Sequence, residues 1–224
     1  EEKARQEQRI IPAGHMIVNT RLRAQFSEAD WAGERMSGVS YLAFLRQLCK
    51  DMDQPKTWPG VLNILEDMRR ILFNAEAMVF NVTLDAPNWD RFQPHLQGFI
   101  HGLPCVNTSQ VSWTPDHHDP FEGLSIPAQV NYVGKGHNLF DEGYAAHGSA
   151  HVISGYLRTS WLWDRIRVQG GAYGAFSMFD RISGTFTLVS YRDPNLLKTL
   201  DNFDQAAGFL RNTPLNEAEL HKAI

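Results

Sequence analysis

The segment RIRVQGGAYGAF, residues 165–176, places the strongest constraint on how this chain folds. It joins a long, mostly apolar run at 143–167 to two short strand-like runs, GAYGAFSMF and GTFTLVSYR. A helix commonly stops at glycine, and a basic side chain such as Arg167 is favourable in its last turn. The segment therefore predicts a helix that ends at Gly170 and Gly171 and is followed by a β-hairpin.

The remaining periodicity predicts an α+β fold, an antiparallel sheet flanked by helices and preceded by a helical segment. Residues 16–48, 61–73 and 89–100 have helical spacing, although Pro94 weakens the last of these. We expect one sheet with the helix 144–166 on one face, built from strands 77–84, 127–134, 171–180 and 184–191. The chain then divides into a helical part, 1–75, and an α+β part, 76–224.

Two Pro-containing turns mark expected helix starts near the end of the chain. Asp193 precedes Pro194, and Thr213 precedes Pro214. Asp and Thr are good N-cap residues, and proline fits the first helical position. Both sites therefore predict a helix that begins at the proline.

Composition excludes several classes of protein. The formal net charge is −4, and no basic stripe is present, so we expect no nucleic-acid partner. No apolar run approaches the roughly 18 residues that a membrane helix needs, so we expect no membrane span. Cys49 and Cys105 are too few for a disulfide framework, which favours a reducing compartment, either the cytoplasm or an organelle matrix. The sequence does not begin with Met, so it does not reveal an N-terminal targeting segment.

The glycines at 170–174 do not match a phosphate-binding loop. Such loops run from strand to glycines to helix, whereas here the order is helix, glycines, strand. Helix termination accounts for Gly170, but Gly171 and Gly174 fall in or beside a strand, where glycine costs stability. Glycine at such positions lets another backbone approach closely, for example a peptide that adds to the sheet edge. Gly170, Gly171 and Gly174 are therefore candidate substrate-binding residues.

Arg167 and Tyr173 flank this glycine segment, and both carry hydrogen-bond donors. A guanidinium and a phenolic O–H together are able to stabilise an oxyanion that forms when a peptide carbonyl is attacked. The alternative is structural: Arg167 caps the helix and Tyr173 packs in the strand. The residues alone leave both interpretations open.

The histidines suggest metal binding only weakly. His147 and His151 have the i, i+4 spacing of a zinc-binding pair, but a metalloprotease helix of the H-E-x-x-H type carries Glu where this chain has Gly148. The run His117-His118-Asp119 lies in a Pro-rich loop that fixes no ligand geometry. No H-x-x-E-H, G-x-S-x-G or cysteine-nucleophile pattern is present. We therefore assign no metal ligands in this chain.

Several segments resemble one family of enzymes. RVQGGAYGAF, VNYVGKG (130–136), GYAAHGSAHVISGYLRTSWLWDRIRVQGGAYG (143–174) and SYRDPN (190–195) are similar to the C-terminal half of pitrilysin/insulinase-type zinc metallopeptidases. AGERMSGVSYLAFLRQL (32–48) and ILFNAEAMVFNVT (71–83) also fit. The similarity is greatest to the presequence-protease branch, which includes falcilysin-like enzymes.

This resemblance implies a C-terminal fragment of an endopeptidase that cleaves unfolded oligopeptides in a chamber between two halves. The N-terminal half of the same polypeptide would hold the zinc, and Arg167 and Tyr173 match the family's Arg and Tyr that reach the substrate. Residues 1–75 would end the third domain, and 76–224 would form most of a shortened fourth domain. The fragment alone would bind no zinc and cleave no peptide. The alternative is a zinc-free relative that binds peptides or assembles with partners.

Overall fold

A computed structural model describes the chain except for residues 108–110, 113, 117–118, 215–216 and 224. The described residues form two compact units. One unit contains residues 1–45 and 115–224, and the other contains residues 46–114. The sheet belongs to the first unit.

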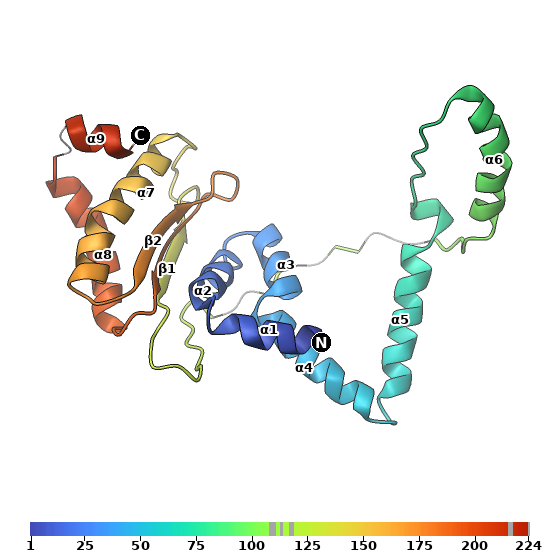
Figure 1. Cartoon of the computed structure of the whole chain (residues 1–224), viewed down its shortest axis with the longest axis horizontal. Coiled ribbons are helices and arrows are strands. Elements are labelled where there is room, and N and C mark those ends of the chain that lie inside the picture. Colours follow the sequence, from blue (N-terminus) through green and yellow to red (C-terminus); the bar gives the residue numbers. More distant parts are fainter. Residues whose placement is uncertain (108–110, 113, 117–118, 215–216, 224) are drawn as a thin grey trace. The chain divides into compact units, whose positions relative to one another are not determined.

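The sheet of the first unit has three antiparallel strands, drawn as arrows in Figure 1. They are β1 (Gly134–Asn138), β2 (Gly174–Phe179) and β3 (Thr185–Tyr191), in the spatial order β1-β3-β2. The register pairs Gly134 with Val189 and Gly174 with Tyr191. The central strand β3 is therefore hydrogen-bonded on both sides.

One face of the sheet is covered by the C-terminal helices (Figure 1). These are α7 (Ser149–Thr159), the π-helical turn η2 (Trp163–Val168) and α8 (Leu197–Asn212), while α9 (Glu217–Ala223) packs against α7. Leu162 and Ile166 are almost fully buried, and they share one apolar cluster with Leu188 of β3 and Phe203 of α8. This cluster is the core of the unit, and burial of its side chains drives this face to close.

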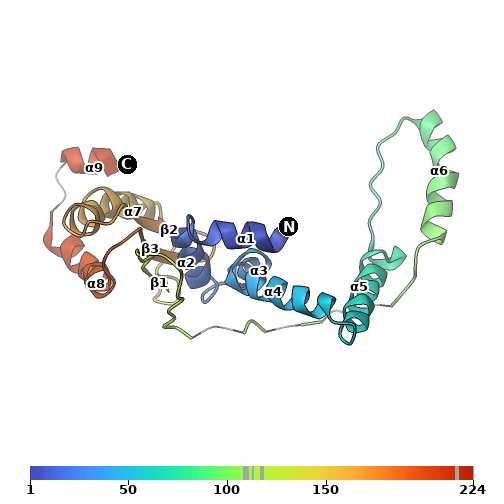
Figure 2. The same ribbon diagram turned by 60° about the horizontal axis from the view of Figure 1, so that its bottom comes forward.

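The other face of the sheet is covered by α2 (Gly14–Arg23), as Figures 1 and 2 both show. The buried Asn19 accepts a 2.7 Å hydrogen bond from the hydroxyl of Thr187. Gly134 permits the close approach, because a Cβ there would lie 2.3 Å from the Val18 side chain. Arg23 at the end of α2 pairs with Asp180 in the turn between β2 and β3.

Three further helices accompany α2 at the start of the chain: α1 (Glu2–Ile10), α3 (Glu28–Ser37) and α4 (Val39–Asp53). Ser27 caps α3 by accepting a hydrogen bond from the Asp30 N–H. The buried Glu34 of α3 pairs with Arg21 of α2 at 3.1 Å. These contacts fix α2 and α3 to each other.

The second unit is helical. It contains α5 (Trp58–Leu72), the short 3-10 turn η1 (Ala75–Ala77) and α6 (Ala86–His101), which holds Pro94 within it. The buried Asn74 binds both backbone groups of Val106 through its side-chain amide. In the described part of the chain, no helix combines the length and the apolar character that a bilayer crossing requires.

The structure confirms the α+β fold with an antiparallel sheet flanked by helices, and it confirms the hairpin of 171–180 and 184–191 to within three residues. Two other predicted strands are wrong. Ala77 ends η1, residues 78–84 form no strand, and Val79 there is 95% exposed. Residues 127–133 contribute only an isolated bridge between Asn131 and Asp193, and β1 begins at Gly134, the last residue of the predicted strand. An apolar run becomes a strand only where a neighbouring strand completes its hydrogen bonds.

The predicted helix boundaries also need correction. The expected helix 144–166 is divided, because α7 stops at Thr159 and Ser160 leaves helical geometry before η2 begins. The helix after Asp193 begins at Leu197 and not at Pro194, since the Asp193 carboxylate accepts the Asn195 N–H and the Thr199 hydroxyl instead of capping the first turn. The predicted start at Pro214 adjoins residues 215–216, which lie outside the described residues, and the described part of α9 is Glu217–Ala223. The division at residue 75 into two domains of an intact protein stays a prediction.

Core burial predicts the effect of one matched pair of substitutions. Ile166→Ala removes a side chain that is 1% exposed and should lower the free energy of unfolding by about 2–5 kcal/mol. Ile182→Ala removes the same atoms from a side chain that is 86% exposed and should change it by less than about 0.5 kcal/mol. Urea denaturation of both variants measures the two values. Equal losses of unfolding free energy in the two variants would contradict the placement of Ile166 in the core and of Ile182 on the surface.

Asp180 predicts how stability changes in acid. Burial alone would raise the pKa of Asp180, but hydrogen bonds from the Ile182 and Ser183 N–H groups, together with the Arg23 guanidinium, outweigh it and lower the pKa. A carboxyl whose pKa is lowered by folding stabilises the protein above its unfolded pKa of about 3.9, and this contribution is lost as the pH falls further.

Asp180→Asn should therefore be less stable than wild type at pH 7 and should lose less stability between pH 5 and pH 3. Denaturation at these pH values measures the difference. Asp201→Asn, on the exposed side of α8, is the control that should follow wild type. Parallel pH profiles for wild type and Asp180→Asn would refute the prediction.

Candidate functional site

A pocket of about 500 Å³ lies at the edge of β2. Among the described strands, β2 has a neighbour on one side only, so the backbone groups of its other edge are unpaired within the sheet. The pocket is lined by residues from α2, α7, η2, β2 and β3: His15, Arg158, Thr159, Trp163, Arg167, Tyr173, Gly174, Ala175, Phe176 and Tyr191. Both proposed donors, Arg167 and Tyr173, are among them. An exposed edge beside a pocket is suited to an extended peptide.

Close packing and backbone geometry explain the glycine pair before β2. A Cβ on Gly170 would lie 2.5 Å from the Ile166 carbonyl oxygen, which leaves no room for a side chain. Gly171 has φ +79°, a conformation that favours glycine. The Gly170 carbonyl accepts a 2.7 Å hydrogen bond from the Asn195 side chain. Gly170 and Gly171 thus turn the chain from η2 into β2, and neither lines the pocket.

Gly174 differs from the other two glycines. It is the first residue of β2 and lines the pocket. A Cβ there would meet the Phe176 ring at 3.5 Å, which is an ordinary contact. The fold therefore has room for a side chain at Gly174, so packing does not require a glycine there, and its substrate-binding role stays a prediction.

Arg167 lies on η2, where the Gln169 N–H bonds back to Asp164 in the π-helical pattern. Its guanidinium stacks over the Trp163 ring at 4.0 Å and forms no ion pair with any described residue. Single π-helical turns are frequent at functional sites because they change the direction of the side chains. Here the turn sets Trp163 and Arg167 against the same pocket.

Tyr173 precedes β2 and is 67% exposed. Its backbone N–H donates to the carbonyl of Tyr191 at 3.0 Å, and its ring meets the Tyr191 ring edge-on at 5.5 Å. No described residue bonds its hydroxyl. The backbone is thus fixed while the O–H remains available, which an oxyanion donor requires. The catalytic roles of Arg167 and Tyr173 stay predictions.

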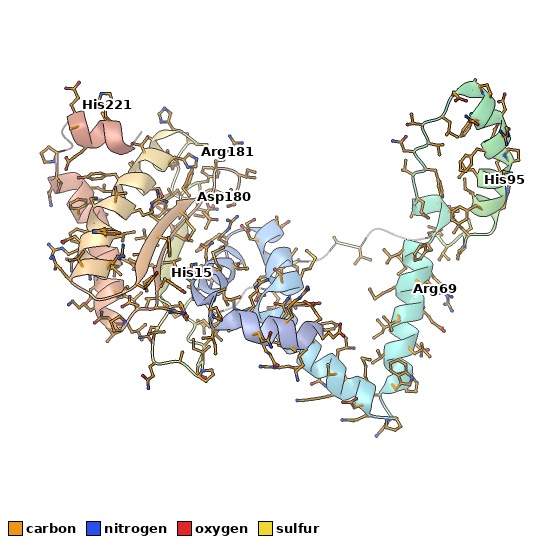
Figure 3. The ribbon with its side chains drawn as sticks, viewed as in Figure 1. His15, Arg69, His95, Asp180, Arg181 and His221 are labelled. Carbon is orange, nitrogen blue, oxygen red and sulfur yellow. The ribbon has the colours of Figure 1, made fainter. Side chains whose placement is uncertain are left out.

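Sequence reasoning missed His15, which Figure 3 labels. Its ring contacts that of Phe176, with centroids 5.3 Å apart, and that of Tyr191, with centroids 4.6 Å apart. Burial lowers the pKa of His15, and Nδ1 has no hydrogen-bond partner among the described residues. Arg158 and Trp163 were likewise missed. No spacing in the sequence signals His15, since it reaches the pocket only because α2 covers the sheet.

The described histidines that were considered as ligands each make another contact in the structure. His147 lies before α7 and accepts the Ser149 N–H at Nδ1, whereas His151 lies on α7 against the Phe179 ring. His117 and His118 lie outside the described residues. Within the described ranges, no group of three or more His, Cys, Asp or Glu side chains is arranged to hold a metal ion.

The three glycines predict a graded series of stabilities. Gly170→Ala should cost the most, because the carbonyl of Ile166 blocks the new Cβ, and a shift of backbone there costs more than about 2 kcal/mol. Gly171→Ala should cost about 1–2 kcal/mol through its left-handed backbone. Gly174→Ala should be neutral or stabilising by about 0.5 kcal/mol. Thermal melts rank the three, and a large loss for Gly174→Ala would contradict the open space found there.

Comparison with known proteins identifies the family. The family model described as the PreP C-terminal domain matches residues 121–224, and the model described as Peptidase M16C associated matches residues 1–48. Presequence protease 1, chloroplastic/mitochondrial, of Arabidopsis thaliana is 43% identical over 224 residues, covering 99% of this chain and 20% of that protein. Protein HypA of Clostridium perfringens is 30% identical over 100% of this chain and 22% of its own length. The mitochondrial presequence protease of Kluyveromyces lactis is 25% identical over a match that covers 94% of this chain and 23% of that protein.

The chain spans about a fifth of the length of these curated relatives. The matched models and the relatives agree with the segments that carry the sequence resemblance, GGAYG and SYRDPN, both of which border the pocket. The chain therefore belongs to the pitrilysin-type (M16) peptidase family and corresponds to the C-terminal region of its presequence proteases.

Proposed function

We propose that this chain is the C-terminal part of a zinc-dependent oligopeptide endopeptidase and supplies Arg167 and Tyr173 to the carbonyl group of a bound peptide. One observation carries the proposal: in a chain of this family, two hydrogen-bond donors that no described residue pairs line one pocket beside a strand edge that is unpaired among the described strands.

The geometry suggests how these residues would act. An extended peptide hydrogen-bonds along the free edge of β2, and Gly174 leaves space for its backbone. The Arg167 fork and the Tyr173 O–H then donate to the carbonyl oxygen as negative charge develops on it. Stacking on the Trp163 ring orients the Arg167 guanidinium before the substrate arrives. The Arg167 side chain therefore loses less conformational entropy when the substrate binds.

The described residues of this chain do not fit a zinc site, since they bring no set of three ligands together. Zinc would polarise the peptide carbonyl or activate water in the intact enzyme. We propose that it is held by the N-terminal half of the same polypeptide, which would also close the chamber over an unfolded oligopeptide. The names of the relatives, chloroplastic/mitochondrial and mitochondrial, support an organelle matrix as the location.

Substitutions in the intact enzyme test the proposed roles. Tyr173→Phe removes one O–H from an exposed ring and should lower kcat about 10²–10³-fold with little change in thermal stability. Arg167→Lys keeps the charge but loses the fork, so kcat should recover only partly relative to Arg167→Ala. Steady-state cleavage of one short peptide, with thermal melts alongside, measures both effects.

Two substitutions outside the pocket serve as controls. Tyr144→Phe removes a hydroxyl that bonds the His147 carbonyl, and Arg181→Lys changes an exposed residue of the β2–β3 turn. Both should keep wild-type kcat. Wild-type kcat in Tyr173→Phe would remove the tyrosine from the mechanism. An intact, zinc-supplied protein that binds peptides and cleaves none would favour the alternative, a non-catalytic peptide-binding or assembly subunit.

A further inference from the structure

The pocket holds a second arginine to which the proposed chemistry gives no role. Arg158 lies in the last turn of α7 and lines the pocket together with Arg167. Neither guanidinium forms an ion pair or a hydrogen bond with a described residue. Arg165, by contrast, forms an ion pair with Asp164 and donates a hydrogen bond to the side chain of Gln169. The two arginines of the pocket are therefore cations with no counter-ion among the described residues.

The rest of the pocket does not neutralise this charge. None of its lining residues carries a carboxylate. His15 adds no anionic group, and because burial lowers the pKa of His15, its ring is neutral at pH 7. The whole chain has a net charge of −4, so a pocket with two uncompensated cations is a local reversal of sign. Such a site attracts an anionic group and repels a cationic one.

The walls of the pocket indicate the chemical form of that anion. Trp163, Phe176 and Tyr191 present aromatic rings, which suit an apolar body and not a freely hydrated ion. Both arginines are solvent-exposed, and a guanidinium binds a planar carboxylate through two parallel hydrogen bonds. A carboxylate attached to a peptide satisfies both features, because its chain covers the rings while its oxygens meet the arginines.

We propose that Arg158, together with Arg167, forms a carboxylate-binding subsite, which selects peptides that carry an acidic side chain or a free C-terminus in this pocket. The proposal rests on the proposed function only in taking the ligand to be a peptide. Arg158 is a specificity residue here: it holds a group of the substrate away from the bond that is cleaved. Arg167 is then shared between the carboxylate and the reacting carbonyl.

The test measures binding separately from cleavage. Fluorescein-labelled peptides of one apolar sequence are titrated with the intact protein in the presence of a metal chelator, and binding is followed by fluorescence anisotropy. The peptides differ only in one Glu or Gln and in a free or amidated C-terminus. Loss of the recognised carboxylate should weaken binding about tenfold, which corresponds to about 1.4 kcal/mol.

Variants assign that preference to Arg158. Arg158→Ala should bind the acidic and the neutral peptides equally, and Arg158→Lys should keep part of the preference because it keeps the charge. Arg211→Ala, which removes an exposed arginine from the last turn of α8, should behave as wild type. Thermal melts of each variant show that the fold is retained.

Each outcome decides the proposal. A preference that disappears on amidation identifies the C-terminal carboxylate, and one that disappears with Gln identifies the acidic side chain; both support the subsite. Equal binding of all peptides by the wild type overturns it, as does a preference that survives in Arg158→Ala. Carboxylate-dependent binding without cleavage by the zinc-supplied protein would refute the proposed peptidase and leave the subsite standing.

Discussion

The fold depends on burying β3 from both sides. Val189 and Ser190 are completely buried, and Leu188 and Thr187 nearly so, although they point to opposite faces. A strand that is covered on both faces needs two separate layers of structure, and the C-terminal helices supply only one. The second layer is α2, and its polar contact to β3, Asn19 with Thr187, joins residues 168 positions apart. The functional geometry follows from this, because α2 brings His15 under the rings that line the pocket.

Sequence reasoning succeeded where local rules determine the structure. Gly171 has a positive φ and Gly170 has no room for a Cβ, so both glycines stand where only glycine fits, and the turn into the hairpin could be predicted from them. Arg167 and Tyr173 lie on either side of that turn, and the structure places both at one pocket. The roles proposed for these residues come from the family resemblance and not from the local pattern.

The missed features depend on contacts between distant segments. Residues 77–84 have the composition of a strand, but composition does not supply the partner strand. Conversely, GKGHN at 134–138 is a poor strand by propensity and still forms β1, because Gly134 and Gly136 let α2 and Thr187 approach within distances that no side chain would allow. His15 and Arg158 are 143 residues apart in number, and only the completed sheet brings them to one pocket.

The residues that line the pocket lie far apart in the sequence, and this has a consequence for folding. Loop closure between distant segments is slow and costs entropy, so we expect contacts such as those of His15 with Tyr191 to form after the local hairpin. The pocket is then absent from any partly folded state in which α2 has not docked. A ligand that fits it binds the finished fold alone and, by mass action, draws the folding equilibrium toward that fold. A ligand in this pocket would thus hold α2 against the sheet for as long as it stays bound.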